Sequence, residues 1–205
     1  MKVVIINGSP RTHGNTSIAI DEMVKVFDSE RVETEIFQIG NRNIRGCVAC
    51  GACMRLGRCT YNDVVNEIAA AFSDADGLVI ATPVYYANAN ATLIACLDRM
   101  FYSSPFDKRM KVGASVVCAR RGGLSATYDQ LNKYFSISSM PIVSSNYWNS
   151  IHGRAPGEAI NDPEGLQTMR LLATNMVFLM RSIALGKEKY GLPESEQKIF
   201  TPFAR

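Results

Sequence analysis

Short apolar runs recur along the first three quarters of the chain and alternate with segments of helical length. The apolar runs cover residues 3–6, 32–39, 77–81, 112–117 and 141–143, and the second of them is mixed with charged residues. The segments of helical length cover residues 16–28, 62–73, 90–102, 124–138 and 163–186. Nearly continuous apolar strands are typical of a parallel sheet that helices cover on both faces. The alternation therefore predicts an α/β fold with a five-stranded parallel sheet, in which ligands bind outside the carboxyl ends of the strands.

The last helical segment carries an apolar stripe that is rich in methionine. Packing in a hydrophobic core is the simplest explanation, because methionine fills irregular gaps between packed elements. We therefore expect residues 147–190 to form a loop followed by a long helix of the same domain. The stripe consists of Leu166, Met169, Leu172, Ala173, Met176, Leu179, Met180 and Ile183.

The composition excludes several classes of protein. With 205 residues, of which 47% are hydrophobic and 20% charged, the chain has the size and composition of one globular domain. No apolar run approaches the roughly 18 residues of a membrane span, and the run near the N-terminus is too short for a signal peptide. The sequence thus predicts a cytoplasmic protein that does not bind a membrane. A net charge of +3, without basic stretches interleaved with aromatic residues, argues against nucleic-acid binding.

The loop at residues 7–16, between the first predicted strand and helix, is rich in groups that can bind an anion. Its glycines allow a ligand to approach the backbone, and the N–H groups at a helix N-terminus attract phosphate. Arg11 adds a full positive charge. The loop has neither the G-x-G-x-x-G fingerprint of dinucleotide sites nor the G-x-x-x-x-G-K-[ST] sequence of P-loops. A phosphate site of another kind on such a sheet points to a mononucleotide such as FMN.

Four of the six cysteines, Cys47, Cys50, Cys53 and Cys59, form the pattern C-x2-C-x2-C-x5-C. Four soft thiolates suit a [4Fe–4S] cluster or tetrahedral zinc equally in number. Steps of three residues resemble the cluster-binding runs of bacterial ferredoxins, whereas zinc ribbons use two separated pairs. An iron–sulfur cluster is the favoured interpretation, with zinc, empty thiols and disulfides as alternatives.

The redox compartment weakens the disulfide alternative. Structural disulfides are rare in a reducing cytoplasm, where the chain is expected to reside. The two remaining cysteines, Cys96 and Cys118, lie in apolar surroundings and are expected in the core. All four cysteines of the run can therefore serve one site.

Four sequence blocks together resemble a known family. They are Gly8-Ser9-Pro10-Arg11 followed by Gly14-Asn15-Thr16, then Thr82-Pro83-Val84-Tyr85-Tyr86, Leu97-Asp98-Arg99 and Ala119-Arg120-Arg121-Gly122-Gly123. The combination resembles the NADPH-dependent FMN reductase family of flavodoxin-like proteins, over roughly the first two thirds of the chain. The cysteine run narrows the resemblance to the iron–sulfur flavoprotein branch, whose compact motif lies between the second strand and the following helix.

This resemblance implies a flavodoxin-like three-layer sandwich whose five parallel strands follow the order 2-1-3-4-5. Residues 1–205 would form a single FMN-binding domain with a cysteine-rich excursion at about 44–61. The first loop would bind the flavin phosphate, the second the ribityl chain and ring, and the third the N1–C2 edge of the reduced ring. The implied FMN-binding residues are Ser9, Arg11, Gly14, Asn15 and Thr16, then Pro83, Val84, Tyr85 and Tyr86, and finally Arg120, Arg121, Gly122 and Gly123. The resemblance also implies a homodimer or homotetramer with the flavin near an interface.

Other polar residues receive structural interpretations. Asp98 and Arg99 are expected to form a pair on a helix surface or at a subunit interface, and His13 is expected to be a structural hydrogen-bonder. The same role is favoured for His152, with the alternative that it lines a flavin or substrate pocket together with Trp148. The sequence identifies no catalytic residue.

Three functions are compatible with these features. The first is an FMN-dependent redox protein that passes electrons between a low-potential donor and a small acceptor, through FMN and a [4Fe–4S] cluster. Ferredoxin and quinones are examples of such partners. The second is an NAD(P)H-dependent FMN or quinone reductase whose cysteine loop is structural or empty. The third is a zinc-stabilised, non-catalytic binding module. The first is the leading hypothesis, because a cluster exchanges single electrons whereas a flavin stores two.

Overall fold

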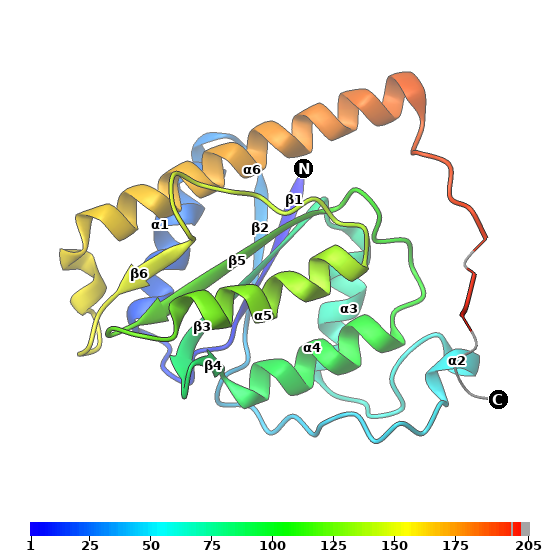
Figure 1. The fold of residues 1–205 in the computed structure, drawn as a ribbon, viewed down its shortest axis with the longest axis horizontal. Coiled ribbons are helices and arrows are strands. Elements are labelled where there is room, and N and C mark those ends of the chain that lie inside the picture. Colours follow the sequence, from blue (N-terminus) through cyan, green and yellow to red (C-terminus); the bar gives the residue numbers. More distant parts are fainter. Residues whose placement is uncertain (198, 202–205) are drawn as a thin grey trace.

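The computed structural model describes residues 1–197 and 199–201, and its strands and helices alternate as the sequence predicts (Figure 1). Each of the five predicted helices is present, with ends that differ from the expected ones by a few residues. In chain order the elements are β1 (Lys2–Asn7), α1 (Asn15–Ser29), β2 (Glu33–Gln38), α2 (Cys53–Leu56), α3 (Val64–Asp74), β3 (Gly77–Tyr85), β4 (Asn88–Ala89), α4 (Ala91–Ser103), β5 (Val112–Ala119), α5 (Leu124–Ile137), β6 (Ser150–His152), the 3-10 helix η1 (Glu158–Asn161) and α6 (Pro163–Tyr190).

The sheet contains parallel strands in the order β2-β1-β3-β5-β6. Counted along the chain, these parallel strands follow the predicted order 2-1-3-4-5. Strand β1 lies between β2 and β3, with Ile5 opposite Ile36 on one side and Val79 on the other. The loops that follow β1 and β3 therefore flank the point at which the strand order reverses, where open α/β sheets bind ligands. The short strand β4 pairs antiparallel with the end of β3, which the apolar pattern does not predict.

The predicted position of the fifth strand, at residues 141–143, is wrong. Ile142 forms only an isolated bridge to Gly113, and the chain then leaves the sheet and returns as β6 at Ser150. The buried Asn149 closes this excursion, because its side chain donates to the Val143 carbonyl and its own carbonyl accepts from the Val117 N–H. The apolar run therefore makes only the first contact with the edge of the sheet. The strand itself forms after a polar turn, at Ser150–His152.

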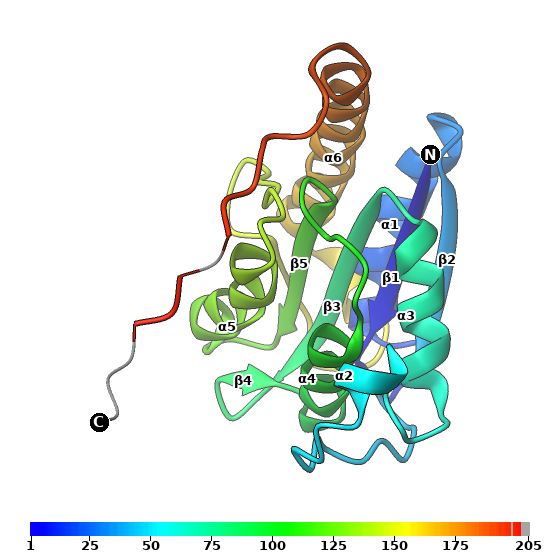
Figure 2. The ribbon, with the colours of Figure 1, turned by 90° about the vertical axis from the view of Figure 1, so that its right-hand side faces the viewer.

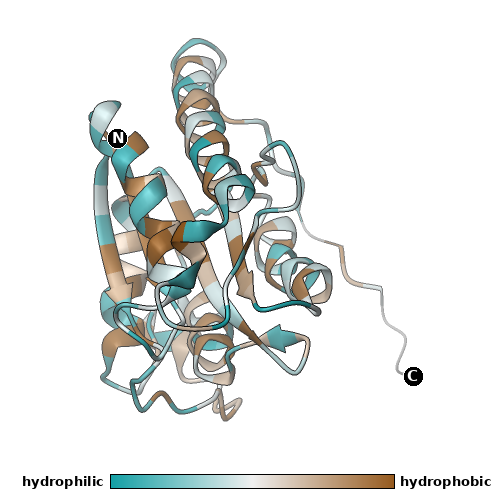
Figure 3. Ribbon diagram, turned by 90° about the vertical axis from the view of Figure 1, so that its left-hand side faces the viewer, coloured by the Kyte–Doolittle hydropathy of each residue, from teal (hydrophilic) through white to brown (hydrophobic). Residues whose placement is uncertain are grey.

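Alternate residues of each strand enter two separate hydrophobic layers. In β1, Val3 and Ile5 lie in the layer under α1 and α6, whereas Val4 and Ile6 lie in the layer under α3, α4 and α5. Figures 1 and 2 show these two helical layers on opposite faces of the sheet. The helices carry alternating hydrophobic and hydrophilic bands in Figure 3, because one side of each is buried. The three-layer prediction is confirmed.

Helix α6 packs along α1 and contributes the methionine stripe to the core. Met169, Met176 and Met180 are buried there, as predicted. Among the residues that the structure describes, α6 is the one helix long and apolar enough to cross a membrane by length and composition alone. Packing on the sheet and α1 accounts for part of that composition, since 33% of the most apolar window of α6 is buried.

The buried side of α5 predicts a measurable contribution to stability. Leu131 is fully buried against the sheet, whereas Ile137 on the same helix is 82% exposed. We expect Leu131→Ala to lower the free energy of unfolding by about 2–5 kcal/mol, because it leaves a cavity in the second layer. Ile137→Ala is the matched control and should change it by less than about 0.5 kcal/mol. Urea unfolding followed by circular dichroism measures both, and equal losses in the two variants would contradict the packing described.

Candidate cofactor sites

Three loops meet at the carboxyl edge of the sheet, after β1, β3 and β5. The first and second are joined through Gly8, whose N–H donates to the Ala81 carbonyl and whose carbonyl accepts from the Asn90 side chain, both at 2.8 Å. The second and third touch at Gly123, where an added Cβ would lie 2.8 Å from both Val84 Cγ1 and Ala87 Cα. The structure thus brings together the three blocks that the sequence assigns to FMN.

The first loop is held in a fixed conformation by residues that the sequence analysis does not identify. Asn7 Oδ1 accepts from the Ser9 N–H at 2.9 Å, and the Gln38 side chain donates to the Ser9 carbonyl. Gly40 passes so close beneath the loop that a Cβ there would lie 2.2 Å from the Ser9 carbonyl oxygen. The sequence feature that could have identified this contact is Gly40 itself, a glycine directly after the second predicted strand and at the same edge of the sheet as the first loop.

The N-terminus of α1 is available to an anion. Gly14 is its N-cap and provides no side-chain hydrogen bond, so the first-turn N–H groups are not capped by that residue. Ser9 Oγ accepts from the Arg11 N–H at 3.2 Å, which curls the loop around this end of the helix. Arg11 and His13 are exposed on the loop. This arrangement agrees with the predicted phosphate site, which stays a prediction.

Of the five predicted phosphate residues only Arg11 is exposed, and two of the four buried ones, Asn15 and Thr16, use their side chains within the fold. The Asn15 side chain donates to the Ala155 carbonyl and accepts from the Ala159 N–H, so it fixes the segment after β6. Thr16 is only 1% exposed and lies beside the thiol of Cys118, whose pKa burial raises to about 12. For these two positions the backbone N–H groups, rather than the side chains, are the groups left for a phosphate.

The second loop is a tight hairpin between β3 and β4. Tyr86 and Ala87 form its tip with φ of 51° and 59°, a left-handed conformation that is unusual for residues other than glycine. Tyr86 is fully exposed at this tip, and Tyr85 is half-exposed. Pro83 and Val84 lie lower on the hairpin and are partly buried. The hairpin therefore presents two aromatic rings at the edge where the flavin is expected.

The third loop carries positive charge to the start of α5. Arg120, Arg121 and Gly122 are exposed, and Gly123 begins the helix with φ of 91°. The N–H groups of this helix end add to the charge of the arginines. The loop is suited to stabilising an anionic ring edge, as the sequence analysis expects.

A hollow of about 520 Å³ adjoins the third loop, and Arg120, His152, Arg154 and Asp162 are among the residues that line it. The Asp162 carboxylate accepts from the His152 N–H at 2.7 Å and lies 3.3 Å from its ring Nδ1. Burial raises the pKa of Asp162, but hydrogen bonds from Gly165 and His152 outweigh it and leave this pKa below its usual value. His152 thus forms the structural hydrogen bonds that the sequence analysis favours.

Trp148 lies elsewhere on the surface of the same connection. The residue is 54% exposed, and its ring packs edge-on against that of Tyr147, with centroids 4.8 Å apart. Tyr147 lines a hollow of about 230 Å³ together with His152. The predicted pairing of Trp148 with His152 in one pocket stays a prediction.

The cysteine-rich segment runs past the C-terminal part of α4, and it contains the short helix α2 (Figure 2). All four of its cysteines line one hollow of about 20 Å³, although they span thirteen residues of the chain. Cys47 and Cys50 are exposed, Cys53 and Cys59 are half-buried, and all are free thiols. Left-handed turns at Ala49, Gly51 and Gly57 curl the backbone around the hollow.

The donor set of this hollow suits a soft metal or cluster. Its lining contains four thiols and no carboxylate. Within residues 1–197 and 199–201, however, no three side chains of His, Cys, Asp or Glu stand close enough together to hold a metal ion. The chemistry of the site therefore supports the predicted cluster, and the ligation by Cys47, Cys50, Cys53 and Cys59 stays a prediction.

The expected pairing of Asp98 with Arg99 is wrong. Asp98 is exposed and accepts from the Tyr134 hydroxyl at 2.5 Å, whereas Arg99 is 1% exposed and faces the cysteine segment. Burial alone would lower the pKa of Arg99, but hydrogen bonds to Asp63 and Cys59 leave it raised. Adjacent helix residues point about 100° apart, so the two side chains meet different neighbours.

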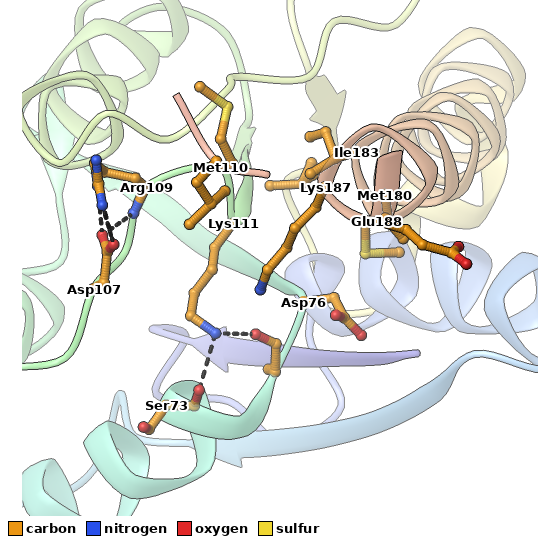
Figure 4. Close-up of a pocket in the computed structure, with 14 residues that line it drawn as sticks. Ser73, Asp76, Asp107, Arg109, Met110, Lys111, Met180, Ile183, Lys187 and Glu188 are labelled. Carbon is orange, nitrogen blue, oxygen red and sulfur yellow. Dashed lines mark hydrogen bonds and ion pairs between the residues drawn. The ribbon is translucent and has the colours of Figure 1, made fainter. Parts of the chain in front are cut away.

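A further hollow, of about 590 Å³, lies at the opposite end of the sheet between α3, β5 and α6 (Figure 4). Two of its three cations, Lys111 and Arg109, are used within the fold. Lys111 donates to the Ser73 and Ala75 carbonyls, where α3 ends, and Arg109 pairs with Asp107. Burial lowers the pKa of Lys111. We regard this hollow as structural, because it is remote from the three loops and its polar groups stabilise a helix end.

Contact between the second and third loops yields a prediction. Gly123→Ala should weaken FMN binding at least about tenfold, because Cβ would strain the left-handed φ and push the hairpin away. Gly186→Ala is the control, since Gly186 lies on α6 outside the three loops and its Cβ would meet nothing within 4 Å. Fluorescence titration of the flavin-free protein with FMN measures both affinities. Equal affinities would mean that the contact between these loops does not shape the site.

Comparisons with known proteins agree with this geometry. The profile of the NADPH-dependent FMN reductase family matches residues 1–154. An iron–sulfur flavoprotein of Methanocaldococcus jannaschii is 34% identical, over 89% of this chain and 99% of its own length. An iron–sulfur flavoprotein of Methanosarcina thermophila is 32% identical, over 92% of this chain and 100% of its own length.

Two solved structures show the same fold. RosB superposes with a TM-score of 0.69 at 17% identity, covering 100% of this chain and 94% of its own. The NAD(P)H:quinone oxidoreductase of Methanothermobacter marburgensis superposes with a TM-score of 0.67 at 15% identity, covering 86% and 97%. At such low identity these likenesses concern the fold, whereas the family profile and the sequence relatives concern the chemistry. The chain therefore belongs to the NADPH-dependent FMN reductase family and is a flavin-dependent oxidoreductase.

Proposed function

We propose that this protein passes electrons between a low-potential donor and a small acceptor through FMN and a [4Fe–4S] cluster. The observation that carries the proposal is the convergence of all four cysteines of the run on one hollow, in a domain with the three flavin loops. The relatives named iron–sulfur flavoproteins match nearly the whole chain and support the same conclusion. A flavin accepts two electrons and a cluster accepts one, so together they connect two-electron and one-electron partners.

The residues of the three loops would divide the binding of FMN among them. Backbone N–H groups at the start of α1, with Ser9 and Arg11, would hold the phosphate. The hairpin residues Tyr85 and Tyr86 would cover the ring or its edge. The positive third loop would stabilise the charge that the ring acquires on reduction.

The cysteine segment would hold the cluster through Cys47, Cys50, Cys53 and Cys59. A cytoplasmic location fits this role, because a reducing compartment keeps the thiols available. The electron donor or acceptor would be a small carrier such as ferredoxin or a quinone. NAD(P)H is a second candidate donor, and the name of the matching family supports it.

An exposed apolar row on α6 supports the expected homodimer or homotetramer. Leu171, Phe178 and Leu185 follow one another at intervals of seven residues and are 37%, 73% and 67% exposed. Apolar residues at heptad spacing are typical of helix–helix interfaces. We propose that this row packs against another copy of the chain.

The alternative function is an NAD(P)H-dependent FMN or quinone reductase whose cysteine segment is structural or empty. The spacing of the side chains favours it, because within the described residues no three side chains of His, Cys, Asp or Glu stand close enough together to hold a metal ion. The family assignment argues against the non-catalytic, zinc-stabilised binding module. Iron content decides between the first two functions, because only the first requires a cluster.

Removal of one cysteine tests the proposed cluster. Wild-type protein purified without oxygen should show flavin bands, the broad visible absorbance of an iron–sulfur cluster and about four irons per chain. Cys50→Ser should lose most of this iron and keep the flavin, because Cys50 lies on the segment and not on the flavin loops. Cys96→Ala, at a buried cysteine outside the segment, is the control and should keep both. Equal iron in Cys50→Ser and wild type would refute the assignment.

Removal of Arg11 tests the phosphate site. Arg11→Ala should weaken FMN binding by roughly 10- to 150-fold, since a charge-assisted hydrogen bond contributes about 1.5–3 kcal/mol. His13→Ala, in the same exposed part of the loop, is the matched control and should bind FMN as wild type does. Riboflavin, which lacks the phosphate, should bind Arg11→Ala and wild type equally. An unchanged FMN affinity in Arg11→Ala would remove this arginine from the site.

A further inference from the structure

Arg99 is the most deeply buried charged side chain near the cysteine segment, at 1% exposure. Its guanidinium forms a two-pronged ion pair with Asp63, with N–O distances of 2.6 and 2.9 Å. A buried arginine is stable only when its charge is paired and its donors are used. Asp63 is the N-cap of α3 as well, so the ion pair links α4 to α3 on either side of the segment.

The remaining donors of Arg99 reach both ends of the cysteine segment. Nη1 donates to the Arg45 carbonyl at 3.2 Å, just before the first cysteine, and Nη2 to the Tyr61 carbonyl at 3.4 Å, just after the last. Nε donates to Cys59 Sγ at 3.2 Å. One side chain on a rigid helix thus holds the start of the segment, its end and one of its sulfurs.

Cys59 is fixed through its backbone as well. The Asn66 side chain accepts from the Cys59 N–H and donates to the Cys59 carbonyl, both at 3.1 Å. With the contact from Arg99, hydrogen bonds hold this cysteine at its nitrogen, its oxygen and its sulfur. Such fixation is typical of the residues around a metal ligand, which orient the ligand before the metal binds.

We infer that Arg99 is a positioning residue that orients Cys59 and raises the reduction potential of the group bound by the four thiolates. The inference rests on the proposed function, because it concerns the cluster assigned to these cysteines. One-electron reduction adds a negative charge to the sulfur-bound group. An N–H···S bond and a nearby guanidinium stabilise that charge, and hydrogen bonds to sulfur are among the features that set cluster potentials.

Asp63 acts in the opposite sense on the same group. Its carboxylate neutralises part of the Arg99 charge and places a negative charge close to the cysteines. The ion pair therefore permits the arginine to be buried while limiting the rise in potential. Changes to the two partners should move the potential in opposite directions, which a purely structural role for the pair does not explain.

Redox titration of the anaerobically purified holoprotein, followed by electron paramagnetic resonance, tests this inference. Arg99→Lys keeps the charge but a lysine cannot hold Asp63 and Cys59 in the same fork. It should shift the cluster midpoint potential to more negative values. Asp63→Asn keeps the N-cap, since asparagine caps helices as well as aspartate, and should shift the potential to more positive values. The FMN potential, read in the same titration, should stay unchanged in both.

Arg55→Lys is the matched control, because Arg55 is exposed on α2 in the same segment. It should leave the cluster potential at the wild-type value. Potentials of Arg99→Lys and Asp63→Asn that equal the control, or that shift in the same direction, would overturn the inference while the proposed function stands. Wild-type protein without iron would overturn both the proposed function and the inference. Two variants are used so that poor folding of one leaves the other to decide.

Discussion

The buried side chain of Asn90 joins the first loop to the second and to α4. Its Nδ2 donates to the Gly8 carbonyl, and its Oδ1 accepts from the Thr92 N–H and so caps the helix. Its backbone N–H donates to the Thr82 hydroxyl, at the end of β3. A capped helix start, strand β3 and the first loop are thus fixed by one residue. Loss of any of these three bonds would destabilise this edge of the sheet, because a buried polar group without a partner costs about 1–3 kcal/mol.

Helix α4 extends this constraint to the cysteine segment. It begins beside the first loop at Asn90 and carries Arg99 nine residues further along, which corresponds to about 14 Å of helix. Leu93 packs closely on Gly8, because a Cβ added to Gly8 would lie 2.8 Å from the Leu93 side chain. Contacts toward both of its ends therefore hold the helix in place. Helix geometry therefore sets the spacing between the three loops and the cysteine hollow.

The sequence predicts the parts of this arrangement that depend on local pattern. Apolar runs identify a doubly covered sheet, the donors of residues 7–16 identify the first loop, and the family resemblance identifies the second and third. Parallel strands bring the three loops to one edge, because their carboxyl ends meet there. The tight spacing of Cys47, Cys50, Cys53 and Cys59 likewise predicts their convergence on one hollow. These inferences need no knowledge of tertiary contacts.

The features that the sequence does not predict depend on distant partners. The role of the Asn15 side chain is set by Ala155 and Ala159, more than a hundred residues away. The β4 hairpin lacks the Asn-Gly or Asp-Gly signal of a two-residue turn, since Tyr86 and Ala87 occupy its tip. The fifth strand is displaced because a buried Asn149 completes the edge of the sheet. The sequence predicts Arg99 on a helix surface or at a subunit interface, whereas it is buried against Asp63, which lies 36 positions earlier.

Positive charge is distributed differently at the two candidate sites. At the flavin edge Arg11, Arg120 and Arg121 are exposed, so water and salt screen them and they can serve an incoming anion as well as a reduced ring. At the cysteine hollow the charge of Arg99 is buried, hence little screened, and Asp63 compensates it. Reduction adds negative charge at either site. An exposed, adaptable set of cations suits a site that exchanges ligands, whereas a fixed and compensated ion pair suits one whose charge changes while its ligands stay in place.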